Sequence, residues 1–190
     1  MEAPAKMVAR ALQSKSRVPV IWLEMQDCAG CTEALSRSHS PTLVDLVLNK
    51  ITIEYQETLF AAAGFQAEEN KKAAMEKYNG QYLLVVEGSI PTDEGGLHCT
   101  IGGRTALDLL QEAAQGAAAI ISTGNCAAFG GIPAANPNPT GAKGVWKIIT
   151  DKPVVNIPGC PAIPEVFTGT LVNFIVFGAL PELDALNRPM

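Results

Sequence analysis

The sequence predicts an α/β fold in which a doubly wound, mainly parallel five-stranded sheet is covered by helices on both faces. Three observations lead to this prediction. Apolar segments rich in Val and Ile alternate with helix-like segments along the chain. The strand-like segments are continuously apolar, which is typical of parallel strands buried on both faces. The chain has 190 residues, 47% of them hydrophobic, which is enough to bury such a core.

Five segments have strand character because they are short, apolar and rich in β-branched residues. They are Val18–Met25, Ile51–Gln56, Tyr82–Glu87, Ala117–Ser122 and Val154–Ile157. In doubly wound sheets, ligands bind beyond the carboxyl ends of the strands, where the strand order reverses. The sequence therefore predicts a flavodoxin-like three-layer sandwich with its functional site at that edge.

The segments between the strands are expected to be largely helical. In Thr32–Lys50, Leu43, Leu46 and Val47 keep helical spacing, and Pro41 suits a helix start. The loop Gly130–Gly144 is longer than most connections, which indicates a functional role. The remaining helical segments are Glu68–Lys77, Arg104–Gln115, the short turn Val145–Thr150, and Pro164–Gly178.

The domain organisation is expected to be simple. Residues 1–17 form a lead-in, residues 18–180 one cluster-binding domain, and residues 181–190 a C-terminal tail. Met1–Val20 lacks the apolar core of a signal peptide. The longest apolar run, Leu171–Leu180, falls short of the ~20 residues of a membrane span.

Charge and composition narrow the classes of partner. A net charge of −5 and an aromatic content of 6% argue against a nucleic-acid partner, because no basic patch could neutralise phosphates. The mean hydropathy of +0.16 is high for a soluble chain and suggests burial against a protein partner.

Four of the five cysteines lie just past the ends of predicted strands. Cys28 and Cys31 follow the first strand, while Cys126 and Cys160 follow the fourth and fifth in turns rich in Gly or Pro. Since parallel strands end at one edge of a sheet, the four thiols are expected to converge. Four thiolates are the ligand set of a 4Fe-4S cluster. Cys99 lies in a separate loop and is expected to be a free thiol.

Other interpretations of the cysteines remain open at this point. The spacing of Cys28 and Cys31 also fits a thioredoxin-type dithiol, although the following residues show no strong helix start. A four-cysteine zinc site is possible, but such sites usually use two close pairs, and Cys126 and Cys160 lie far apart. The cysteines would be inert in the third interpretation, in which they are simply buried.

Seven motifs carry a resemblance to a known family. They are Trp22-Leu23, Cys28-Ala-Gly-Cys-Thr-Glu33, Glu54-Tyr-Gln-Glu57 with Ala61-Ala-Ala-Gly64, Val86-Glu-Gly-Ser-Ile-Pro91, Cys126-Ala-Ala-Phe-Gly-Gly131, Asn136-Pro-Asn-Pro139 and Pro158-Gly-Cys-Pro161. With these motifs the chain resembles the N-terminal flavodoxin-like domain of the small, electron-transfer subunit of nickel–iron hydrogenases.

The resemblance implies a relay function inside an H2:acceptor oxidoreductase. It implies that Cys28, Cys31, Cys126 and Cys160 bind one proximal 4Fe-4S cluster. Electrons would pass between a nickel–iron centre in a large partner subunit and a downstream acceptor. In that case the H2-activating site lies outside this chain.

The resemblance also assigns two acidic positions. Glu33 and Glu57 match residues that the family places near possible proton paths, whereas the plainer interpretation is a helix-capping or interface carboxylate. Gly30 and Gly131 occupy positions at which oxygen-tolerant relatives carry extra cysteines. The chain therefore resembles the oxygen-sensitive type.

The end of the chain departs from the family pattern. Small subunits usually continue past Asn187–Pro189 with a second cluster domain, so Met190 suggests either a shortened chain or a one-cluster subunit. His39 and His98 do not match the histidine site of that domain. The family implies a periplasmic location if a leader was removed, and a cytoplasmic one is possible for the chain as it stands.

Two other functions are compatible with a flavodoxin-like fold. A one-cluster subunit of a quinone-reducing respiratory complex shares the fold, but usually has adjacent cysteines in the first motif. A flavodoxin-like carrier of FMN needs a phosphate-binding loop after the first strand, where Asp27 would repel phosphate.

Overall fold

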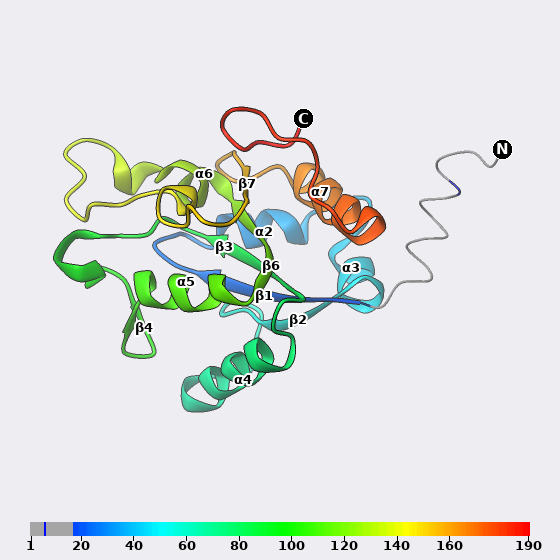
Figure 1. Ribbon diagram of the computed structural model, residues 1–190, viewed down its shortest axis with the longest axis horizontal. Helices are drawn as coiled ribbons and strands as arrows, with labels where there is room; N and C mark the ends of the chain where they lie inside the picture. The colour runs from blue at the N-terminus through cyan, green and yellow to red at the C-terminus, as the bar shows by residue number, and fades with distance from the viewer. Residues whose placement is uncertain (1–5, 7–16) are drawn as a thin grey trace.

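The sheet of the protein is parallel throughout and has the strand order β2-β1-β3-β6-β7 (Figure 1). The computed structural model describes residue 6 and residues 17–190. The strands are β1 (Val18–Glu24), β2 (Ile51–Tyr55), β3 (Tyr82–Glu87), β6 (Ala117–Thr123) and β7 (Val154–Ile157). The chain runs from β1 outward to β2 and then returns to β3 on the other side, so the strand order reverses between β1 and β3. This confirms the predicted doubly wound sheet.

The helices form a layer on each face of the sheet. Buried residues of α2 (Gly30–Ser36), α3 (Leu43–Asn49) and α7 (Pro164–Phe177) pack on one face. Those of α4 (Gly64–Lys77) and α5 (Ala106–Gln115) pack on the other. Figure 1 shows α3 and α7 on the opposite side of the sheet from α4 and α5. The three-layer arrangement is thus confirmed.

Short elements complete the fold. The helix α6 (Gly124–Phe129) follows β6 at the carboxyl edge of the sheet. The two short strands β4 and β5 form an antiparallel hairpin. These short strands and the 3-10 turns are β4 (Thr100–Ile101), β5 (Arg104–Thr105), η1 (Asp93–Gly96), η2 (Ile132–Ala134) and η3 (Val145–Lys147).

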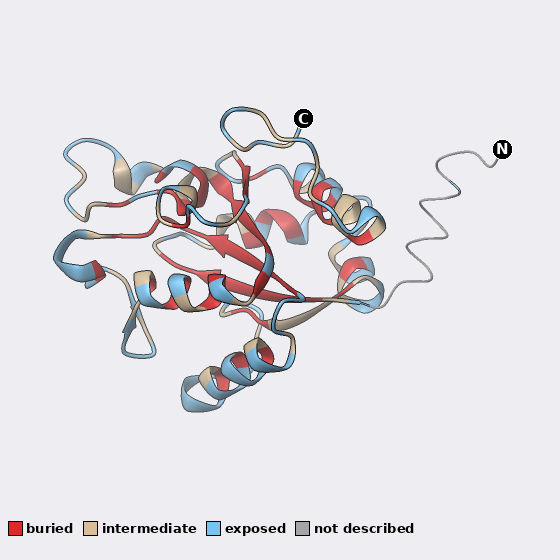
Figure 2. Ribbon diagram, in the orientation of Figure 1, coloured by how far each residue is buried: buried red, intermediate tan, exposed pale blue. Residues whose placement is uncertain are grey.

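The core lies on both faces of β3, which is buried at every position (Figure 2). Leu84 packs with Leu110 and Ile120 on the α5 face. Trp22 lies on the opposite face, where its ring centroid is 5.3 Å from that of Phe167 in α7. Each strand therefore contributes apolar side chains to both layers, which explains why the strand segments are continuously apolar in the sequence.

The first prediction concerns this core. Leu84→Ala should lower the free energy of unfolding by about 2–5 kcal/mol, because it removes a fully buried side chain and leaves a cavity. Leu97→Ala is the matched control, since Leu97 is 64% exposed, and its effect should stay within about 0.5 kcal/mol. Urea unfolding measures both values. Equal losses in the two variants would contradict the assignment of the core.

The segment Thr32–Lys50, which was expected to be helical, contains parts of two separate helices, α2 and α3. Pro41 lies in the break, and a proline disfavours helical backbone at the residue before it, here Ser40. The chain becomes helical again after Thr42, whose Oγ1 accepts a hydrogen bond from the Asp45 N–H at 3.1 Å. This capping box starts α3 at Leu43.

Two other helix boundaries differ from the prediction. The expected helix over Arg104–Gln115 begins later, at Ala106, because Arg104 pairs in the β4–β5 hairpin and Thr105 caps α5. The expected helix over Glu68–Lys77 begins earlier, with α4 starting at Gly64. The strand boundaries, by contrast, agree to within one residue at each end.

The C-terminal residues return to the sheet. The Asn156 N–H of the edge strand β7 donates to the Asn187 carbonyl at 2.8 Å, so residues 181–190 lie against that edge. The predicted division into lead-in, domain and tail stays a prediction, and most of the lead-in lies outside the described residues. Within the described part of the chain, every helix is too short or too polar to cross a bilayer.

Candidate metal centre

Four thiols line one pocket at the carboxyl edge of the sheet. Cys28 follows β1, Cys31 lies in the first turn of α2, Cys126 lies in α6 after β6, and Cys160 follows β7. The pocket has a volume of about 110 Å³ and is open to solvent. All four cysteines are free thiols. The structure therefore brings together the four cysteines that the sequence selected, and it places Cys126 on a short helix rather than in a turn.

Glycine backbone passes directly against three of these sulfurs. A Cβ atom built on Gly131 would lie 2.5 Å from the Cys126 Sγ, and one on Gly30 would lie 3.1 Å from the Cys28 Sγ. A Cβ on Gly124 would collide with the Cys31 Sγ. Gly124 and Gly131 also have positive φ, so a side chain there would require a shift of the cage, whereas at Gly30 the Cys28 thiol would have to move by only a few tenths of an ångström.

Burial raises the pKa of two of these thiols. The pKa of Cys31 is raised to about 12; Glu87, Cys126 and Cys28 add to the shift, and a hydrogen bond from the Ala162 backbone opposes it. Burial likewise raises the pKa of Cys126, against a hydrogen bond from the Ile132 backbone. Ionising the set together requires positive charge between the sulfurs, which bound metal ions supply. An all-sulfur donor set selects iron–sulfur or zinc, so the residues fit an iron–sulfur cluster and also a zinc ion.

The start of α2 was missed by the sequence analysis, which expected no strong helix start after Cys31. The helix begins at Gly30, and its N-cap residue Ala29 has no side-chain oxygen. The carboxylate of Glu87, at the end of β3, takes the cap position instead. Its Oε1 accepts the Cys31 N–H at 2.8 Å, and its Oε2 accepts the Thr32 N–H at 3.0 Å.

Glu87 belongs to a group of three carboxyl side chains, of which Glu24 and Glu87 are buried and Asp27 is exposed. Glu24 is its register partner on β1, and the Thr32 hydroxyl lies 3.0 Å from the Glu24 Oε1 and 2.7 Å from the Glu87 Oε2. Carboxyl oxygens of Glu24, Glu87 and Asp27 lie within 4.8 Å of one another. Burial and these two neighbours raise the pKa of Asp27 to about 6, and burial raises that of Glu87.

The sequence held a signal for this group. Both glutamates are the last residue of an otherwise apolar strand, where a charged side chain is out of pattern. Glu24 accepts hydrogen bonds from the Gln56 Nε2 at 2.8 Å and from the Thr58 hydroxyl at 2.6 Å. These bonds tie the end of β1 to the segment that follows β2.

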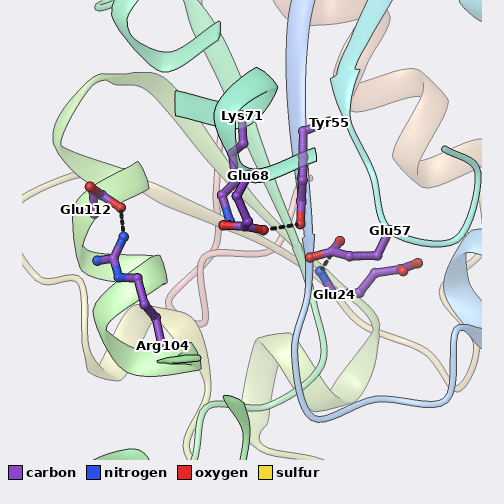
Figure 3. Close-up of polar contacts among 7 residues, drawn as sticks. All are labelled: Glu24, Tyr55, Glu57, Glu68, Lys71, Arg104 and Glu112. Atoms are coloured by element: carbon purple, nitrogen blue, oxygen red, sulfur yellow. Dashed lines mark hydrogen bonds and ion pairs between the residues drawn. The ribbon is translucent and has the colours of Figure 1, made fainter. Parts of the chain in front are cut away.

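Glu33 and Glu57 lie in different environments. Glu33 is exposed on α2, where its Oε1 accepts a hydrogen bond from the Arg37 Nε at 2.7 Å. Glu57 is half-buried, and its Oε2 accepts the Glu24 N–H at 3.1 Å (Figure 3). Its Oε1 has no hydrogen-bond partner among the residues that the structure describes. Burial raises the pKa of Glu57 to about 7; Glu24 adds to the shift, and Lys71 opposes it.

Polar groups continue from Glu57 toward α4. Together with Tyr55 and Glu68, Glu57 lines a second pocket of about 260 Å³. The Tyr55 hydroxyl donates to the Glu68 Oε1 at 3.0 Å, and the Glu68 Oε2 lies 2.7 Å from the Lys71 Nζ (Figure 3). Glu57 thus lies between Glu24, which belongs to the carboxyl side chains near the thiols, and this second pocket.

The remaining candidate residues lie apart from the thiol pocket. Cys99 is half-buried against the core on the α5 face, as expected of a free thiol, and burial raises its pKa. His39 and His98 are exposed. An apolar surface adjoins the pocket instead, where Ile132 is 80% exposed and Phe129 39% exposed.

Comparison with known proteins gives consistent matches. Residues 28–174 match the family described as "NADH ubiquinone oxidoreductase, 20 Kd subunit". The chain is 49% identical to the "Hydrogenase-2 small chain" of Escherichia coli K12, over 99% of this chain and 50% of that protein. It is 46% identical to the "Uptake hydrogenase small subunit" of Azotobacter vinelandii, over 97% of this chain and 52% of that protein. The chain therefore spans about half the length of these curated relatives.

Solved structures show the same fold. The reduced, active form of the Ni-Fe-Se hydrogenase from Desulfomicrobium baculatum superposes with a TM-score of 0.88. The match has 36% sequence identity and covers 92% of this chain and 70% of that one. The fold and the sequence thus both match those of known hydrogenase chains.

Proposed function

The chain belongs to the NADH ubiquinone oxidoreductase 20 kDa subunit family, as a hydrogenase small subunit, and we propose that it relays electrons within a nickel–iron hydrogenase. The observation that carries the proposal is the convergence of four thiols, from the ends of separate parallel strands, on one pocket. In this proposal the H2-activating nickel–iron centre lies in a large partner subunit, and a downstream acceptor takes the electrons.

The residues of this chain would each have a defined task. Cys28, Cys31, Cys126 and Cys160 would hold one 4Fe-4S cluster, which supplies one-electron transfer when bound. The glycines beside the sulfurs keep side chains out of the cage. The exposed apolar side chains beside the pocket, with Ile163 and Val166 at the start of α7, would be covered by the large subunit, which would also exclude water.

The alternative functions explain less. The family description also covers subunits of respiratory complexes, but the 49% identity is to a hydrogenase small chain. A carrier of FMN would need to bind phosphate in this pocket. The three neighbouring carboxyl groups of Glu24, Asp27 and Glu87 would repel it. We expect the protein to lie in the periplasm if a leader is removed, as the family implies. Cell fractionation tests this location.

The direct test is analysis of the protein purified with its partner subunits. Hydrogen-dependent reduction of a viologen dye is expected, together with a broad absorption shoulder in the blue. Substituting the cysteine ligands of this cluster should lower the content of the complex by about four iron and four sulfide ions. A resolved flavin spectrum, or zinc in place of iron, would overturn the proposal.

We place Glu57 on a proton path. A carboxyl group with a pKa near 7 can both accept and release protons at neutral pH. Glu57→Gln should lower proton–deuterium exchange and turnover by at least about tenfold while leaving the iron content unchanged. Glu33→Gln is the parallel test for Glu33. Full turnover and unchanged isotope exchange in that variant would remove Glu33 from the path.

Glu57→Gln should also change the stability of the protein, in a direction that depends on pH. The pKa of Glu57 is raised from 4.5 to about 7, so the folded protein binds this proton more tightly than the unfolded chain. On account of Glu57, the free energy of unfolding therefore falls as pH rises from 4.5 to 7. Glu57→Gln cannot titrate, so the variant should gain about 1–3 kcal/mol relative to the parent protein across that range. A difference that is constant with pH would contradict this.

Oxygen sensitivity remains a prediction. Gly131 has φ +56, and any Cβ there would press on Cys126, so the position suits neither a cysteine nor another side chain without a shift of the cage. Because Gly30 and Gly131 stand where oxygen-tolerant relatives carry extra cysteines, hydrogen oxidation should stop under air and recover slowly after oxygen is removed. Sustained turnover in air, measured with an electrode, would show that the family pattern of glycines does not set oxygen sensitivity here.

A further inference from the structure

Three backbone N–H groups at the start of α2 have no carbonyl partner inside the helix. The first intrahelical bond runs from the Glu33 N–H to the Ala29 carbonyl at 3.0 Å, which leaves the N–H groups of Gly30, Cys31 and Thr32. Such groups are usually satisfied by the N-cap side chain, but alanine has no oxygen to offer. All three donors lie at or beside Cys31, a cysteine of the cage.

Glu87 takes two of these donors. Its two oxygens accept the N–H groups of Cys31 and Thr32, and the Thr32 hydroxyl lies 2.7 Å from the Oε2. Both amide partners are donors, so Glu87 acts as an acceptor, as a carboxylate does. The side chain is 2% exposed and lines the thiol pocket. It is therefore fixed in place, close to the sulfurs and shielded from water.

From this geometry, and on the basis of the proposed function, we infer that Glu87 is a positioning residue that lowers the reduction potential of the cluster. Backbone N–H groups that donate to cluster sulfur favour the reduced form, because that form carries more negative charge. The N–H groups of Cys31 and Thr32 are committed to Glu87 instead. A buried negative charge in the pocket wall also opposes the addition of an electron.

Two substitutions separate these contributions. Glu87→Gln removes the charge and leaves one acceptor oxygen in place of two. Glu87→Asp keeps the charge, but its shorter side chain cannot reach both N–H groups. The matched control is Glu33→Gln, which removes a carboxylate from the same helix at an exposed position.

The experiment is a redox titration followed by electron paramagnetic resonance, on the intact protein with its partner subunits, together with iron analysis. Glu87→Gln should favour the reduced cluster at least tenfold, which is 59 mV for a one-electron couple. Glu87→Asp should shift the potential upward by a smaller amount. Glu33→Gln should change the equilibrium less than twofold.

The outcomes separate this inference from the proposed function. If the parent protein lacks a four-iron cluster on these cysteines, the proposed function fails. If the parent is loaded and both loaded variants keep the parent potential, Glu87 does not set it and the inference fails. Loss of the cluster in both variants also overturns the inference, because Glu87 would then be needed for assembly.

Discussion

Cys126→Ala is expected to remove about four iron atoms per complex and to lower hydrogen-dependent dye reduction by more than about 100-fold. The reason is that Cys126 supplies one of four thiols around a single pocket, and no other sulfur of residue 6 or residues 17–190 lines that pocket. Loss of a residue that only supports a metal ligand already costs 10–100-fold in many sites, so loss of a ligand should cost more.

The fifth cysteine provides the control. Cys99 is half-buried against the core on the α5 face, outside the pocket. Cys99→Ala should therefore keep the full iron content and near-normal dye reduction, with at most a small loss of stability. Metal analysis and dye assays of the two purified variants decide the matter. Full iron in Cys126→Ala, or lost iron in Cys99→Ala, would show that the ligand set is assigned wrongly.

Gly124→Ala is expected to have the second largest effect. Gly124 has φ +84, a left-handed backbone conformation that costs another residue about 1–2 kcal/mol. The new Cβ would also collide with the Cys31 Sγ, so either that thiol or the start of α6 must move. Both effects act on the cage. We expect a 10–100-fold loss of cluster occupancy at limiting iron.

The matched control is a glycine in open space. Gly169 lies in α7, and a Cβ there would meet nothing within 4 Å. Gly169→Ala should therefore leave cluster occupancy unchanged and raise the free energy of unfolding by about 0.5–1 kcal/mol, since alanine is the better helix former. Reconstitution with iron and sulfide, followed by absorption, compares the two variants. Normal occupancy in Gly124→Ala would show that the cage tolerates a side chain there.

Local patterns were reliable for the strands. Continuous apolar runs such as Tyr82–Glu87 identified every strand of the main sheet, because burial on both faces leaves no polar alternation. Helix boundaries were less certain. The break between α2 and α3, and the hairpin that delays α5, depend on caps and on short pairings such as Arg104 with Ile101.

The candidate ligands were predictable for a related reason. A parallel sheet places the ends of all its strands at one edge, so cysteines after β1, β6 and β7 must come near one another. No such rule of sheet geometry brings Glu33 close to Glu57. The sequence grouped them as acidic candidates, whereas one is exposed beside Arg37 and the other is half-buried beside Glu24.

The strands of the sheet, its carboxyl edge and the cysteines at that edge could be predicted, because each of these features follows from residues close together in the chain. The support of the cage could not. Glu87 caps α2 from 56 residues away, and Gly124 makes room for Cys31 from another strand end. Such contacts depend on how β1, β3 and β6 are arranged in space, and this is why local periodicity could not reveal them.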